Sequence, residues 1–120
     1  MKTVSLQTAK ALVEAGVVIE CEKCWSKVAE DDWRLMVPLI KEHLNYHDRW
    51  LAAPDATELL EWLPTIITLE TYSPLDNFLL TLSAGEEYTA SYGMAYTAKN
   101  VNPAEALAQL AIHLRKEGLV

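Results

Sequence analysis

The stretch Asn102–Gly118, with the sequence NPAEALAQLAIHLRKEG, is the strongest indication of fold in this 120-residue chain. Asn102 suits a helix N-cap, and Pro103 suits the first helical position because its φ angle is already helical. Apolar residues then recur with the period of one helix face, at positions 107, 110, 111 and 114. Gly118 is a typical residue for ending a helix. We therefore predict a helix here that buries one face in a core.

Two further helices are predicted earlier in the chain, from the residues that suit their first and last positions. Ser5 is a good N-cap and Gly16 a good terminating residue, so the first helix lies between them. The second follows Pro54, where Asp55 and Glu58 have the spacing of a capping box, and it ends before Pro64.

Between these helices the apolar period changes from about 3.6 to 2, which indicates strands. We predict five strands, at 25–28, 33–37, 66–72, 78–82 and 88–97. In the last of these, Thr89, Ser91, Gly93 and Thr97 share one face. The segment 39–50 is ambiguous, and we favour a short helix. The predicted fold is one α+β domain over residues 1–120, with an antiparallel sheet of about five strands and three main helices packed on it.

The chain is acidic, with 17 Asp and Glu against 10 Lys and Arg and a formal charge of −7. This balance argues against general nucleic-acid binding and against an anionic membrane surface. No apolar run approaches the about 20 residues that span a bilayer. The N-terminus does not have the apolar core of a signal peptide, so we expect a cytoplasmic location.

Cys21-x-x-Cys24 and His43-x-x-x-His47 form the sharpest chemical motif. Two thiolates and two imidazoles can complete a tetrahedral structural zinc site. The gap between the pairs is longer than the usual ~12–15 residues. The alternatives are free thiols with surface histidines, or a redox pair, which would need a helix N-terminus after a strand. Our principal expectation is a protein without a cofactor.

No arrangement of residues indicates catalysis, because the carboxylates fall mostly in turns and on polar helix faces. We therefore predict that the protein is not an enzyme. Aromatic residues are the better candidates for function, since Trp and Tyr often anchor protein interfaces; core packing is the alternative. The candidate interface residues are Trp25, Trp33, Trp50, Tyr88, Tyr92 and Tyr96.

Four segments together resemble a group of small phage- and prophage-encoded proteins of no assigned function. These are the opening segment 4–12, the Trp25 and Trp33 hairpin, the capped segment 53–64 and the segment 102–108. The resemblance covers most of the chain, and its motifs are structural. It implies no catalytic residues.

The sequence thus favours a non-catalytic phage or prophage accessory protein that acts by protein–protein interaction in the bacterial cytoplasm. One concrete form is an inhibitor of a host or defence protein. The alternatives are a structural zinc-binding module and a small-ligand-binding domain. A homodimer is compatible with each of these functions.

Overall fold

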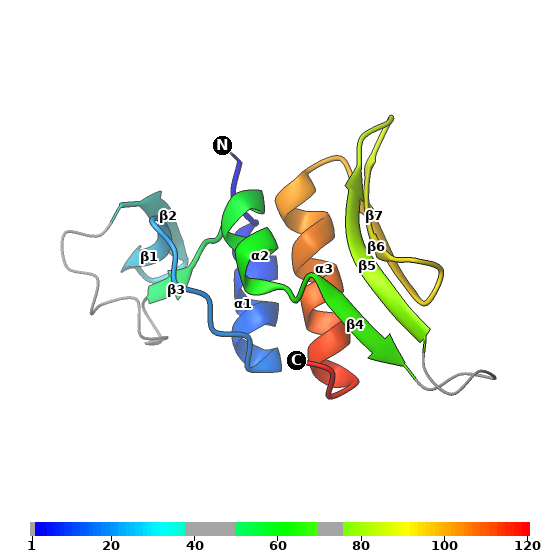
Figure 1. Ribbon diagram of the computed structural model, residues 1–120. Helices are drawn as coiled ribbons and strands as arrows, with labels where there is room; N and C mark the ends of the chain where they lie inside the picture. The colour runs from blue at the N-terminus through cyan, green and yellow to red at the C-terminus, as the bar shows by residue number, and fades with distance from the viewer. Residues whose placement is uncertain (1, 38–49, 70–75) are drawn as a thin grey trace.

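Helix α3 lies at the centre of the computed structural model, which describes residues 2–37, 50–69 and 76–120 (Figure 1). It contacts α1 and α2 on one side and strands β6 and β7 on the other. The helices are α1 (Leu6–Ala15), α2 (Ala56–Trp62) and α3 (Pro103–Lys116). The strands are β1 (Cys24–Ala29), β2 (Asp32–Met36), β3 (Trp50–Ala52), β4 (Ile66–Leu69), β5 (Asp76–Ser83), β6 (Tyr88–Tyr92) and β7 (Tyr96–Asn100).

The predicted α+β class is confirmed, but the predicted single sheet of about five strands is wrong. The described strands form two antiparallel sheets, one in the order β2-β1-β3 and one in the order β4-β5-β6-β7. The larger sheet packs on α3, and the smaller sheet lies beyond α1 and α2 (Figure 1). The molecule is therefore elongated, with extents of 53 × 30 × 22 Å.

All three predicted helices are confirmed, with their caps. The Ser5 hydroxyl accepts a hydrogen bond from the Thr8 N–H, and Gly16 ends α1 with φ 79°. The Asp55 carboxylate accepts from the Glu58 N–H while the Glu58 carboxylate accepts from the Asp55 N–H, which completes the capping box of α2.

The predicted strand 88–97 is wrong, because the chain reverses inside it. Residues 88–92 and 96–100 form β6 and β7, which pair with Tyr92 opposite Tyr96. The turn between them begins at Gly93, whose φ of 57° is a left-handed conformation that glycine adopts without steric cost. The alternation of polar and apolar residues continues through this turn, so the two strands resemble one in the sequence.

The prediction also missed β3, which is too short at 50–52 to show a period. Residues 39–49 of the helix predicted at 39–50 lie outside the described residues, as do residues 70–72 of the strand predicted at 66–72.

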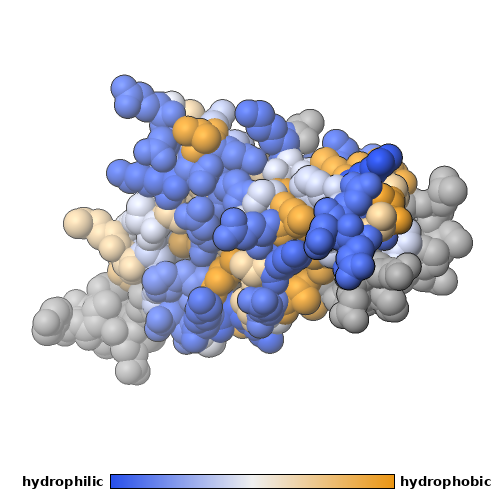
Figure 2. Space-filling view, turned by 180° about the vertical axis from the view of Figure 1, so that it is seen from behind, coloured by the Kyte–Doolittle hydropathy of each residue, from blue (hydrophilic) through white to orange (hydrophobic). Residues whose placement is uncertain are grey.

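The core gathers around α3, which is buried on more than one side. Small alanines let α1, α2 and the larger sheet approach the helix closely, while leucines fill the space between them. The buried residues of this helix are Ala104, Ala106, Leu107, Ala108, Leu110, Ala111 and Leu114. From behind, the molecule is mostly hydrophilic, with apolar side chains showing between polar ones (Figure 2). Among the described residues, no helix has the length and apolar character required to cross a membrane.

Candidate interaction surface

The two cysteines of the predicted zinc site are buried in the smaller sheet and in the segment before it. The Cys21 thiol donates to the Lys23 carbonyl oxygen over 3.1 Å. Burial, and next the nearby Glu58 carboxylate, raise the pKa of Cys21 to about 12. Burial also raises the pKa of Cys24. Burial thus favours the neutral thiol at both positions.

The other two predicted ligands, His43 and His47, lie outside the described residues. Within residues 2–37, 50–69 and 76–120, no group of three or more His, Cys, Asp and Glu side chains is placed to hold a metal ion. The zinc site stays a prediction.

The predicted interface aromatics near the N-terminus belong to the smaller sheet. Trp25 and Trp33 are half-buried on the face toward α1, where the Trp25 indole N–H donates to the Val4 carbonyl oxygen over 3.1 Å. The ammonium groups of Lys10 and Lys27 lie 5.4 and 5.9 Å from the centre of a Trp33 ring. Trp50, also half-buried, pairs with Ser26 and so faces the opposite side of this sheet. Trp33 therefore connects the smaller sheet to α1, and Trp25 connects it to the segment just before that helix.

The three predicted interface tyrosines lie on the inner face of the larger sheet, toward α3. Tyr92 has 0% exposure, and its hydroxyl donates to the Pro64 carbonyl oxygen over 2.6 Å. Tyr96 meets the His113 ring edge-on, with centroids 5.0 Å apart, and Tyr88 is half-buried. A side chain as enclosed as Tyr92 packs the core and has no surface to offer a partner.

The opposite face of the larger sheet is open to solvent, and no helix covers it in Figure 1. We call it the threonine face, because hydroxyl side chains dominate it. The strand register places on it Ile66, Thr68, Asn77, Leu79, Thr81, Ser83, Thr89, Ser91, Thr97 and Lys99. Lys99 is the one charged member of this set, although charged residues make up 22% of the chain.

Side chains of the threonine face hold one another in place through hydrogen bonds. The Thr68 hydroxyl donates to the Asn77 amide oxygen over 2.8 Å, and the Thr81 and Ser91 hydroxyls lie 2.9 Å apart. Ile66 and Leu79 are opposite each other across β4 and β5, with 50% and 58% exposure. This surface is thus a fixed polar array with an apolar pair on it.

Sequence reasoning found only part of this face. It placed Thr89, Ser91 and Thr97 together, but it assigned them no function and put them in a single strand. Polar residues at 77, 81 and 83, which alternate with apolar residues at 78, 80 and 82, are a usable signal for the β5 part of the face. Most of the aromatic residues predicted for an interface point inward.

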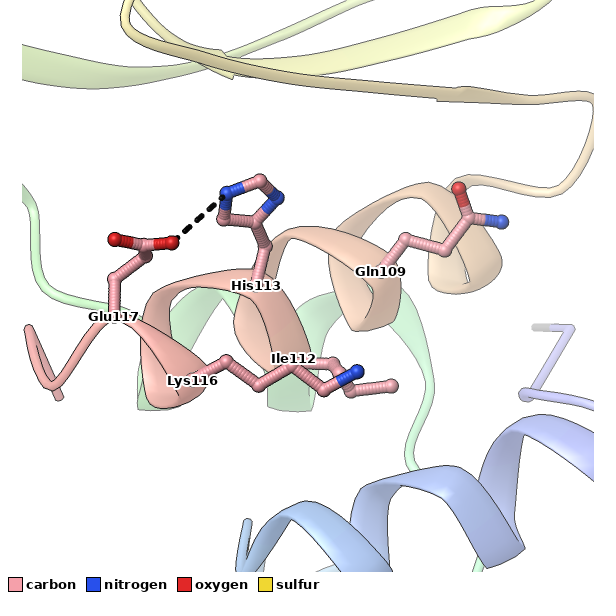
Figure 3. A pocket seen from close by; sticks show the side chains of 5 residues that line it. All are labelled: Gln109, Ile112, His113, Lys116 and Glu117. Atoms are coloured by element: carbon pink, nitrogen blue, oxygen red, sulfur yellow. Dashed lines mark ion pairs between the residues drawn. The ribbon is translucent and has the colours of Figure 1, made fainter.

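A second surface feature lies on the exposed part of α3, where Gln109 and His113 project toward the strands (Figure 3). It is a pocket of about 320 Å³ lined by Gln109, Ile112, His113, Lys116 and Glu117. The His113 Nε2 atom lies 3.9 Å from a Glu117 carboxylate oxygen. The Tyr96 ring against His113 connects this pocket to β7.

Comparison of the chain with protein-family models, with curated proteins and with solved structures gives no match. The function is therefore argued from the geometry of these surfaces.

Proposed function

We propose that this protein is non-catalytic and acts by binding another protein through the threonine face. The observation that supports the proposal is the low charge of this exposed face in a chain of net charge −7. Charged residues are depleted at the centre of protein interfaces, because each buried charge must be stripped of water.

The composition of the face suits a protein partner. Ile66 and Leu79 together supply apolar area that a partner can cover. The surrounding hydroxyl groups both donate and accept hydrogen bonds. Threonine is stiff at its first side-chain torsion, so ordering it on binding costs little conformational entropy.

In its most specific form, the proposal is a phage or prophage accessory protein that inhibits a host or defence protein in the bacterial cytoplasm. The resemblance of segments 4–12, 53–64 and 102–108 supports this form. The net charge of −7 supports a basic partner, whose approach it would accelerate by long-range attraction.

A pull-down from bacterial lysate with three matched baits tests the proposal. The baits are the unaltered protein, Leu79→Lys on the threonine face, and Val18→Lys, whose side chain has a similar exposure of 60% but lies outside that face. We expect a partner that the unaltered protein and Val18→Lys retain and that Leu79→Lys loses, because the added charge would have to be buried.

Circular dichroism first establishes that all three baits are folded. Recovery of no specific partner, or equal recovery by Leu79→Lys, would contradict the proposal.

A further inference from the structure

Strand β7 forms an edge of the larger sheet, because β6 is its one strand neighbour among the described residues. The outer side of an edge strand presents backbone N–H and C=O groups that can pair with a further strand. Bulges and prolines often block such edges, but β7 pairs with β6 in an unbroken register and contains no proline. Its one charged side chain, Lys99, lies on the threonine face. The backbone of β7 is therefore suited to pairing with another strand.

The most exposed large apolar residues of the described chain lie at the two ends of β7. Met94 has 98% exposure and Val101 has 69%, whereas every other described residue of this kind has 60% or less. Met94 lies two residues before β7, and Val101 follows it directly. Packing within one chain covers neither side chain, so both offer apolar area to a partner at the β7 edge.

A two-fold axis at the centre of β7 brings these two residues together. The midpoint between positions 94 and 101 falls between Thr97 and Ala98, in the central part of the strand. Antiparallel pairing of β7 with β7 of a second copy therefore places Met94 of each copy beside Val101 of the other. With the axis at either Thr97 or Ala98, Lys99 lies opposite an uncharged residue, so like charges do not face each other directly.

The position of α3 is compatible with this pairing. The helix packs against both β6 and β7 on the inner face of the sheet (Figure 1). Strands in a sheet are about 4.8 Å apart, so a helix over these two strands lies about 5 Å from an axis at the β7 edge. The α3 helices of two copies are then about 10 Å apart, a distance at which helices pack against each other. The second copy thus contributes a strand and a helix to the same contact.

The exposed side of α3 lies next to the β7 edge, since Tyr96 of β7 contacts His113 of the helix. This side carries the pocket, where Ile112 is half-buried (Figure 3). Lys116 and Glu117 have opposite charges, so the pocket lining has no net formal charge when His113 is neutral. Two chains of net charge −7 can therefore meet on this side without bringing a concentration of like charge together.

We propose that the chain forms a two-fold homodimer in which β7 pairs antiparallel with β7 of a second copy. The two four-stranded sheets then make one continuous sheet. Both α3 helices lie on its inner face, and the two threonine faces are continuous on the other side. The inference is independent of the proposed function, although the dimer would present twice the area of threonine face to a partner.

Sedimentation velocity of the folded full-length chain over a concentration series tests the inference. We expect a reversible monomer–dimer equilibrium, with slower hydrogen exchange of backbone amides in Tyr96–Asn100 where the dimer is populated. Met94→Lys and Val101→Glu should each weaken dimerisation about tenfold, because each dimer would bury two of the introduced charges. Val18→Glu introduces a charge at an exposed residue away from this edge and should leave dimerisation within about twofold.

The double variant Met94→Lys/Val101→Glu tests the contact between these two residues. Within one chain they lie at opposite ends of β7, whereas in the dimer each new ammonium group lies beside a new carboxylate of the other copy. The double variant should therefore dimerise more tightly than either single variant. A double variant that dimerises more weakly than both single variants would overturn the proposed register.

Circular dichroism first establishes that every variant is folded. A chain that stays monomeric over the whole series would overturn the inference, as would a dimer whose β7 amides exchange as fast as those of the monomer. A dimer that Leu79→Lys disrupts and Met94→Lys leaves intact would place the contact on the threonine face and would overturn it too.

Discussion

At the scale of single residues, Gly93 has a conformation and a neighbour that both select glycine. Its φ is 57°, and a Cβ atom there would lie 2.6 Å from the Cδ1 atom of Phe78. We expect Gly93→Ala to lower the free energy of unfolding by about 2–3 kcal/mol, from backbone strain plus displacement of the Phe78 ring. Urea unfolding measures the loss.

Gly118→Ala is the matched control for this prediction. Gly118 also has a positive φ, 73°, but a Cβ there would meet no atom within 4 Å. This variant should lose only the strain contribution, about 1 kcal/mol. Equal losses of unfolding free energy in the two variants would show that contact with the Phe78 ring adds nothing to the cost of Gly93→Ala.

At the scale of elements, α2 depends on its cap because it has only seven residues, too few for a helix to be stable alone. Asp55→Ala removes the acceptor of the Glu58 N–H and should lower the free energy of unfolding by about 1 kcal/mol. Thermal or urea unfolding measures this. Glu61→Ala, which changes an exposed acidic residue of the same helix outside its cap, should have little effect. If Glu61→Ala lowered the free energy of unfolding as much as Asp55→Ala, the stabilisation could not be assigned to the capping box.

The elements also show why the sequence predicted some features and not others. Ser5, Asp55 and Asn102 act within their own helical turns, so a local pattern was enough to place α1, α2 and α3. The β6–β7 reversal depends on one glycine, Gly93, inside an otherwise regular alternation.

The candidate site was less predictable because its residues come from four strands. The threonine face exists only through the register that sets Ile66 opposite Leu79, and β5 beside β6. Such register is non-local, and side-chain period alone does not distinguish the inner face of a sheet from the outer one. The inward placement of Tyr92 could not be predicted from the sequence either, because aromatic residues suit both cores and interfaces.

At the scale of the whole molecule, stability should fall in alkaline solution. Burial raises the pKa of Tyr92 from 10.0 to about 12, and burial with the nearby Glu58 charge raises that of Cys21 from 9.0 to about 12. Both groups ionise more readily in the unfolded chain, so the stability they give is complete below pH 9. It is lost between pH 9 and 12 for Cys21, and between pH 10 and 12 for Tyr92.

Urea unfolding at intervals from pH 8 to 11 measures this loss. Cys21→Ala should make the fall between pH 9 and 10 less steep, and the raised pKa of the Cys24 thiol accounts for part of what remains. A free energy of unfolding that stays constant from pH 8 to 11 would contradict the prediction.

The central position of α3 has a consequence for biosynthesis. This helix follows every other described element along the chain, yet its buried residues complete the core from both sides. A ribosome-bound chain that ends at β7 has made both sheets and still lacks the helix that covers the inner face of the larger one. The core around α3 therefore cannot be complete before α3 is synthesised, and until then the apolar inner face of the larger sheet has no helix to cover it.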